Sequence, residues 1–415
     1  MNPNNSINEL NSNSINELAS NSINEPIHNS TMGIKILVIG DPHFKVSNVL
    51  ETENMCSAII QQCKKYTPHI IVVLGDVLDR HENIHVGPLN RAIKFLATLM
   101  NIAPTFVLIG NHDLKNNQQF LSDEHPFSSL KHWTPHDQGH DCIYDDVSKI
   151  PKMNIVDVPH RIDVCGNIFM FVPYVPCKRF IEALDHIPNW RDVSTKCIFA
   201  HQEFIGAKMG AIISTEGDEW ELEYPFVVSG HIHDYQKIQD NILYIGTPIQ
   251  HSYGDQQDKT ISCFTFLRDG CIAGENIKQM DEYDVEYSKE YNYIHQRIDL
   301  KLPKKTIVRI TCEQVSTYTP PKNCELKIII RGNSGQIKSI IRHPNIDVWK
   351  QLNYKIVYKD TPHNNNNNNI DSTINAVAAI PKRYSTILYD TISEQPPLKT
   401  LFHNLFGDIV NTNNN

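Results

Sequence analysis

The sequence predicts an α/β fold, in which helices cover the outer faces of a β-sandwich. Two features of its 415 residues indicate this fold. Short apolar runs typical of buried strands alternate with stretches of helical periodicity between residues 34 and 245. Asp, Asn or His follows several of these runs, at the point where a strand would end. A chain of this length has room for two or three domains.

The first third of the chain alternates strand and helix patterns. Ile34–Ile39 is an apolar run interrupted only by Lys35, as expected for a strand covered on both faces. A helix is predicted from about Val49 to Lys65, and the strand Ile70–Leu74 follows it. A second helix is predicted over Pro88–Met100, because proline is favoured in the first helical turn. The further predicted strands are Thr105–Ile109, Ile168–Val172, Cys197–Ala200, Phe226–Val228 and Ile242–Ile245.

Composition excludes several classes of protein. No run of 18 apolar residues is present to span a membrane, and the polar N-terminus lacks the basic and apolar regions of a secretory signal. The ten cysteines form no Cys-x-x-Cys pair, which favours free thiols in a reducing compartment over disulfides or a zinc site. We therefore expect an intracellular protein, cytoplasmic or nuclear, that is neither secreted nor embedded in a membrane.

Five segments are predicted along the chain. Residues 1–32 repeat the unit Asn-Ser-Ile-Asn-Glu and are too polar to offset the entropy cost of ordering, and Met32 offers an alternative start. The remaining segments are an α/β domain (33–282), a small basic domain (283–360), an Asn-rich linker (361–374) and a helical tail (375–415).

Five short polar blocks follow predicted strands. They are Gly40-Asp41-Pro42-His43, Gly75-Asp76-Val77-Leu78-Asp79-Arg80, Gly110-Asn111-His112-Asp113, His201 and Gly230-His231-Ile232-His233. The carboxyl ends of strands are where α/β sheets bind ligands, and the glycines let the backbone approach a bound ion. Any one block is common by chance, whereas five in order, each after a strand, predict one shared metal site.

These blocks resemble the D-x-H, G-D-x-x-D, G-N-H-D/E, H and G-H-x-H motifs of calcineurin-like metallophosphoesterases. The resemblance covers roughly Ile34 to Asp255 and implies that family's fold, with two divalent metal ions that share a bridging carboxylate. It implies a first ion held by Asp41, His43, Asp76 and His233, and a second held by Asp76, Asn111, His201 and His231. Mixed oxygen and nitrogen ligands favour Mn²⁺, with Fe or Zn²⁺ as alternatives.

The resemblance also implies catalytic roles. Two cations about 3.5–4 Å apart activate a bridging water and stabilise an in-line phosphoryl displacement. His112 would donate a proton to the leaving oxygen, and Asp79 would fix the tautomer of His112. Arg80 resembles a phosphate-contacting arginine, although a surface ion pair is the alternative. The histidines expected to be solvated loop side chains are His125, His132, His136 and His140.

Two features of the sequence narrow the range of expected substrates. Tyr244-Ile245-Gly246-Thr247-Pro248, with Gly254-Asp255 downstream, looks like the matching stretch of SbcD-like exonucleases and their phage counterparts. The segment from Lys301 to Lys359 has a net charge of +9, so the rest of the chain carries -18. In the resembling nucleases a small domain caps the site and helps to hold DNA. The candidate DNA contacts are Lys327, Arg331, Lys338 and Arg342, and a solvated basic surface is the alternative.

The sequence therefore predicts a two-metal phosphodiesterase acting on DNA, an exonuclease or endonuclease of recombination and repair. The alternative is a metallophosphoesterase of small molecules or phosphoproteins. A non-catalytic scaffold is disfavoured, because every ligand position and His112 are present.

A partner is predicted from the tail. Its apolar residues recur at helical spacing from Leu398 to Ile409. In SbcD-like nucleases the region after the cap binds an SMC-like ATPase. We expect this helix either to bind such a partner or to pack on its own chain, and the sequence leaves a homodimer open.

Overall fold

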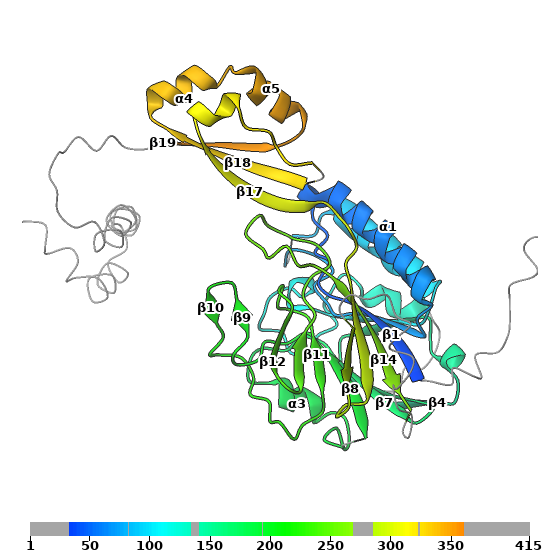
Figure 1. Cartoon of the computed structure of the whole chain (residues 1–415). Coiled ribbons are helices and arrows are strands. Elements are labelled where there is room, and N and C mark those ends of the chain that lie inside the picture. The colour runs from blue at the N-terminus through cyan, green and yellow to red at the C-terminus, as the bar shows by residue number, and fades with distance from the viewer. Residues whose placement is uncertain are drawn as a thin grey trace, which may run out of the picture. The chain divides into compact units, whose positions relative to one another are not determined.

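The protein is described by a computed structural model (Figure 1). The structure describes residues 33–81, 83–133, 141–192, 194–268, 285–322 and 324–360. The repeats of residues 1–32, the Asn-rich linker and the predicted tail helix lie outside the described residues. Residues 33–332 and 336–359 belong to one compact unit of the chain. Among the described residues, no helix is both long and apolar enough to cross a membrane.

The first β-sheet has seven strands in the order β15-β16-β14-β1-β2-β3-β5. These are β1 (Gly33–Ile39), β2 (Ile70–Val73), β3 (Thr105–Leu108), β5 (Met153–Val156), β14 (Ile261–Leu267), β15 (Val285–Ser288) and β16 (Tyr293–Ile298). β1, β2, β3 and β5 run parallel, so their carboxyl ends meet at one edge. β14 and β16 extend the sheet by antiparallel pairing.

The second β-sheet has seven strands in the order β12-β13-β11-β8-β7-β6-β4. These are β4 (Asp141–Tyr144), β6 (His160–Val164), β7 (Asn167–Val172), β8 (Thr195–Ala200), β11 (Val227–Ser229), β12 (Gln236–Gln239) and β13 (Ile242–Tyr244). Side chains of both sheets share one buried cluster, in which the rings of Phe106 and Phe171 stack with centroids 4.0 Å apart. The two sheets therefore pack face to face, which confirms the predicted sandwich.

Helices cover the outer faces of the sandwich. α1 (Val49–Tyr66) and α2 (Val86–Met100) pack on the first sheet, and α3 (Phe180–Leu184) packs on the second. α1 buries Thr52, Met55, Ile59 and Cys63. This spacing of three or four residues places them on one helical face. Short elements complete the domain: β9 (Lys208–Met209), β10 (Ile212–Ile213) and the 3₁₀ turns Val46–Asn48, Asn111–Asp113, Ser128–Trp133 and Val147–Lys149.

The small domain has a three-stranded sheet in the order β17-β18-β19. Its elements are β17 (Lys304–Thr311), the 3₁₀ turn Glu313–Ser316, β18 (Cys324–Gly332), α4 (Ser334–Ile340), α5 (Pro344–Gln351) and β19 (Lys355–Asp360). Ile328 and Ile330 of the sheet pack with Ile346 and Trp349 of α5. The helices therefore cover one face of this sheet.

The structure places the boundary between the α/β domain and the small domain later in the chain than the sequence predicted. The sequence assigned residues from 283 onward to the small domain, but β16 pairs with β14 and β15 pairs with β16. Both strands complete the first sheet, because an antiparallel return of the chain supplies the partners that β14 needs. The small domain accordingly begins with β17 at Lys304.

Candidate metal centre

The polar blocks converge at one edge of the sandwich. Asp41 and His43 follow β1, Asp76 follows β2 and Asn111 follows β3 of the first sheet. The second sheet contributes His201 after β8, and His231 and His233 after β11. Since β8 and β11 are parallel, their carboxyl ends lie together. The structure therefore brings all seven predicted ligands into one site.

The ligand atoms form two groups. Those of Asp41, His43 and His233 lie within 4.8 Å of one another, as do those of Asp76, His201 and His231. Each group contains three of the four ligands predicted for one ion: the prediction also gave Asp76 to the first ion and Asn111 to the second.

Asp76 lies between the two groups. Its Oδ2 is 3.7 Å from His43 Nε2, and its Oδ1 is 3.4 Å from His201 Nε2. Asn111 joins the second group, with its Oδ1 3.1 Å from His201 Nε2 and 3.0 Å from His231 Nδ1. This geometry suits a bridging role for the Asp76 carboxylate.

The protonation of His201 indicates a cation. His201 Nδ1 is 2.7 Å from the carbonyl of Leu74, which can only accept, so Nδ1 carries the hydrogen. A neutral ring then presents the Nε2 lone pair to the oxygens of Asp76 and Asn111. Lone pairs facing one another at this distance need a positive charge between them, either a proton or a metal ion. The fixed tautomer is also the arrangement typical of metal-bound histidine.

The first group gives the same indication. His43 Nε2 and His233 Nε2 are 3.1 Å apart, so the two rings can share one hydrogen bond or turn both nitrogens toward one ion. Asp41 Oδ1 is buried and has no hydrogen-bond partner among the described residues. A buried carboxylate oxygen without a partner is costly unless a cation compensates it. Both donor sets therefore fit divalent metal ions.

The backbone holds these ligands in uncommon conformations. His43, Asp76 and His231 have φ values of 45°, 46° and 75°. Such strain persists where the surroundings enforce it, and it is concentrated at functional sites. Backbone N–H groups also orient the carboxylates: that of His112 donates to Asp76 at 2.8 Å, and that of His231 donates to Asp41 at 2.9 Å.

The buried groups of the site shift one another's pKa values. Burial lowers the pKa of His201, but the carboxylates of Asp76 and Asp41 outweigh burial and raise it to about 9, so a metal ion would bind by displacing the proton of His201. Burial raises the pKa of Asp76, but the imidazoles of His201 and His43 outweigh burial and hold it well below its ordinary value. Burial and the neighbouring His251 lower the pKa of His43 well below its ordinary value. At neutral pH Asp76 is therefore a carboxylate and His43 a neutral ring, which are the forms that coordinate metals.

Comparison with known proteins identifies the family. A family model for calcineurin-like phosphoesterases matches residues 34–235. A protein of Invertebrate iridescent virus 6, "Putative phosphoesterase 244L", is 39% identical over 312 residues, which cover 74% of this chain and 96% of that protein. "Putative phosphoesterase 078R" of Invertebrate iridescent virus 3 is 37% identical over 327 residues, which cover 77% and 81%. The chain belongs to the calcineurin-like phosphoesterase family.

The family of the chain indicates which reaction the site can support, namely hydrolysis of a phosphate ester. When bound, two divalent ions polarise a water and neutralise charge on the phosphoryl oxygens. His112 lies beside them, with its Nε2 3.9 Å from Asp76 Oδ2 and its side chain 35% exposed. It can therefore meet a substrate from solvent and donate a proton to a leaving oxygen.

Asp79 is placed differently from the prediction. Its Oδ1 lies 3.2 Å from Lys45 Nζ and 3.9 Å from His43 Nδ1. His112 Nδ1 is buried without a hydrogen-bond partner among the described residues, and its ring stacks on His81. Asp79 thus forms an ion pair with Lys45, and His43 Nδ1 has no hydrogen-bond partner among the described residues. In the β2 loop, Leu78 pairs in parallel with Phe44 beside β1, and the backbone N–H groups of Val77 and Leu78 donate to Asp113.

The other candidate residues are dispersed. Arg80 is exposed and lines a pocket with Asp79 and Lys45, beside the metal centre. Lys327 and Arg331 lie on β18, whereas Lys338 lies on α4 and Arg342 follows it. The four candidate DNA contacts therefore do not form one surface.

Sequence reasoning missed several contacts. His251 Nε2 donates to the carbonyl of Asp41 at 3.1 Å, and Glu203 Oε2 lies 3.6 Å from His231 Nε2. Their only signal was nearness in sequence to one of the five polar blocks, which does not show where a loop folds. The prediction for His125 was wrong: its side chain is fully buried and contacts Asp157 at 3.2 Å.

Proposed function

We propose that this phosphoesterase hydrolyses phosphodiester bonds of DNA, in the manner of SbcD-like nucleases and with Mn²⁺ as its metal. The metal centre supports hydrolysis of a phosphate ester but does not select among esters. The observation that favours DNA is the charge on the uncovered face of the small domain's sheet.

This uncovered face is defined by strand alternation. Side chains of a strand point alternately to opposite faces, and Val308, Ile328 and Ile356 pack with the helices. The residues between them point to the other face. The basic side chains on that face, named here the basic sheet face, are Arg309, Lys327, Arg331, Lys355 and Lys359.

The basic sheet face carries mostly exposed charges and few acids, although Lys305 and Ile329 of the same face are buried. Arg309, Arg331, Lys355 and Lys359 are exposed, and Lys327 is half-buried. The register places Arg309 of β17 beside Ile329 of β18. Arg309 therefore lies between Lys327 and Arg331 of the neighbouring strand. Glu325 is the acidic residue on this face of β18. A spread of positive charge of this kind matches a phosphate backbone.

The helix-covered side bears a second set of basic residues. Lys338 and Arg342 are exposed there, while Ile337 and Ile340 of α4 pack toward the sheet. One duplex cannot lie against both sides of the same sheet. We therefore assign DNA contact to the basic sheet face and leave Lys338 and Arg342 outside the contact.

The experiment that tests this function compares substrates. Purified protein with Mn²⁺ is incubated with end-labelled single-stranded and duplex DNA, with bis-p-nitrophenyl phosphate and with a phosphopeptide. DNA cleavage is expected, together with slower hydrolysis of the small diester, because the small diester cannot reach the basic sheet face. Dephosphorylation of the peptide without DNA cleavage would contradict the proposal and favour the phosphatase alternative.

A further inference from the structure

One loop contacts both the metal centre and the small domain. It runs from residue 247 to residue 257 and follows β13 directly. Asp255 fixes its shape, because one carboxylate oxygen accepts the backbone N–H groups of His251 at 2.8 Å and Ser252 at 3.0 Å. Two neighbouring residues of this loop, Gln250 and His251, point to different partners.

His251 contacts the first group of ligands. Its Nε2–H donates to the carbonyl of Asp41, and its ring lies edge-on to those of His43, at 4.7 Å, and His233, at 5.3 Å. A carbonyl can only accept, so the hydrogen bond fixes the orientation of the His251 ring. His251 thus touches all three residues of the first ligand group.

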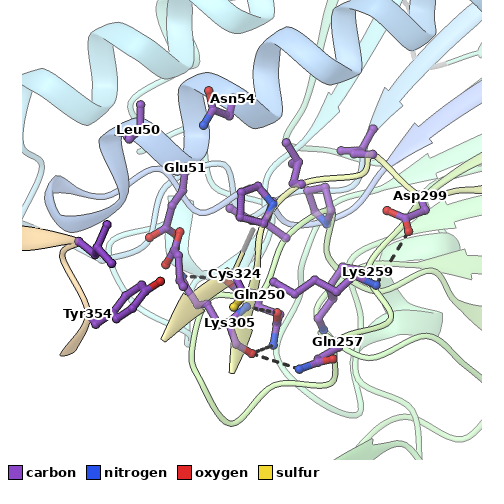
Figure 2. A pocket seen from close by; sticks show the side chains of 18 residues that line it. Leu50, Glu51, Asn54, Gln250, Gln257, Lys259, Asp299, Lys305, Cys324 and Tyr354 are labelled. Carbon is purple, nitrogen blue, oxygen red and sulfur yellow. Dashed lines mark hydrogen bonds and ion pairs between the residues drawn. The ribbon is translucent and has the colours of Figure 1, made fainter. Parts of the chain in front are cut away.

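Gln250 binds the first strand of the small domain. Its Oε1 accepts from the backbone N–H of Lys305 at 2.7 Å, and its Nε2 donates to the Lys305 carbonyl at 3.2 Å. The Lys305 ammonium returns to the loop by donating to the Gln250 carbonyl at 3.0 Å, and it pairs with Glu51 of α1 (Figure 2). Lys305 is only 8% exposed, so these bonds are little weakened by water.

This junction is partly hollow. A cavity of about 380 Å³ lies beside Gln250 and Lys305, and α1, the loop and the small domain all line it. Apolar side chains such as Leu50, Ile249 and Leu352 line the cavity without filling it, so the hydrogen bonds of Gln250 and Lys305 help to fix the position of β17 relative to the loop.

We propose that His251 is a positioning residue for the first metal ion and that Gln250 makes this positioning depend on the small domain. A shift of β17 pulls Gln250 through its paired hydrogen bonds. The adjacent His251 then moves against Asp41, His43 and His233. Groups that orient metal ligands without binding the metal commonly alter affinity by about 10–100-fold. The inference rests on the metal centre and does not require that DNA be the substrate.

The test measures Mn²⁺ binding to the metal-free full chain by calorimetry. His251→Ala should lower the affinity for one of the two Mn²⁺ ions by about 10–100-fold. His251→Gln restores an N–H that can reach the Asp41 carbonyl, so most of the affinity should return. His251→Ala with both ions bound as in the wild type would overturn the positioning role.

A matched pair of glutamines tests the dependence on the small domain. Gln257 also bonds β17, through the Lys305 carbonyl at 3.4 Å and Thr306 Oγ1 at 3.1 Å, but it is not adjacent to His251. Gln250→Ala should lower the affinity for the same Mn²⁺ ion as His251→Ala. Gln257→Ala should leave the affinity for both ions unchanged. Equal effects of the two glutamine variants would overturn the coupling. Unfolding midpoints in EDTA show whether each variant is folded, so the outcome does not depend on catalysis.

Discussion

His112 is the candidate proton donor, and its surroundings differ from those that the sequence suggested. The ring stacks on His81 with centroids 4.9 Å apart and lies edge-on to His43 at 5.2 Å. Its orientation therefore comes from neighbouring rings and from the backbone, whereas Asp79 pairs with Lys45. His112 therefore remains the candidate proton donor, whereas Asp79 forms an ion pair beside the ligand His43.

Substitution at the two positions should separate these roles. His112→Asn should retain both metal ions and lose turnover by about 10²–10⁴-fold, the usual contribution of a positioned proton donor. Asp79→Asn should keep most of the turnover at saturating metal, because Asp79 pairs with Lys45. It should need somewhat more Mn²⁺, because the substitution removes a negative charge that lies 3.9 Å from His43 Nδ1 without hydrogen-bonding it. Turnover against Mn²⁺ concentration measures both effects. A loss in Asp79→Asn as large as that in His112→Asn would mean that Asp79 does act through the acid.

The ends of the strands approach one another so closely that only glycine fits at some positions. A Cβ atom on Gly110, which opens the polar block after β3, would lie 2.2 Å from the Asp76 backbone nitrogen and 2.3 Å from Asp76 Oδ1. Gly110 has φ -85°, a value that any residue adopts, so the constraint is space and not backbone conformation. The two neighbouring strands can therefore place Asp76 and Asn111 around one pair of ions.

Gly110→Ala should consequently impair metal binding although Gly110 is not a ligand. The added methyl group displaces Asp76, so we expect both ions to bind about 10–100-fold more weakly. Gly87→Ala is the control, because a Cβ there meets nothing closer than the Arg91 side chain at 3.6 Å. Calorimetric Mn²⁺ titration of the two variants is the measurement. Unchanged binding in Gly110→Ala would show that the strand ends can separate without cost.

The elements themselves were largely predictable, and their contacts were less so. Strands such as β1 and β2 are apolar runs buried on both faces, a pattern visible in sequence alone. The convergence of the polar blocks was predictable because parallel strands bring their carboxyl ends together, whereas the seven individual ligands came from the resemblance to the family. The pairing of β15 and β16 with the first sheet was missed, since the half-exposed sequence of β15 carries no such pattern. His251 was missed because a loop's path depends on tertiary contacts.

At the scale of the whole molecule, the proposed function has two parts, ester hydrolysis and substrate binding, and they lie on differently charged domains. The metal centre lies on the sandwich, whereas the small domain, from Lys304 to Asp360, has a net charge of +7. Phosphate contacts along a nucleic acid can hold a long substrate without contributing to the chemistry of one ester bond. Substrate length should therefore matter more than the identity of the ester.

Charge reversal on each side of the small domain tests this division. Arg309, Lys327 and Arg331 changed to Glu should weaken DNA binding, and the log–log salt slope should fall by about 0.9 for each duplex phosphate that the protein no longer neutralises. The matched variant reverses Lys338, Arg342 and Lys350, which gives the same change in net charge on the helix-covered side. Fluorescence anisotropy at several salt concentrations measures both. Equal weakening in the two variants would show that only total charge matters.

The most direct measurement is anomalous diffraction from crystals of the protein soaked in Mn²⁺. The structure predicts two peaks about 3.5–4 Å apart with Asp76 between them, and crystals of Asp76→Asn should lack at least one. The ligands expected around the first peak are Asp41, His43 and His233, and those around the second are Asn111, His201 and His231. A single peak in the wild type, or strong peaks elsewhere on the chain, would contradict the two-ion centre.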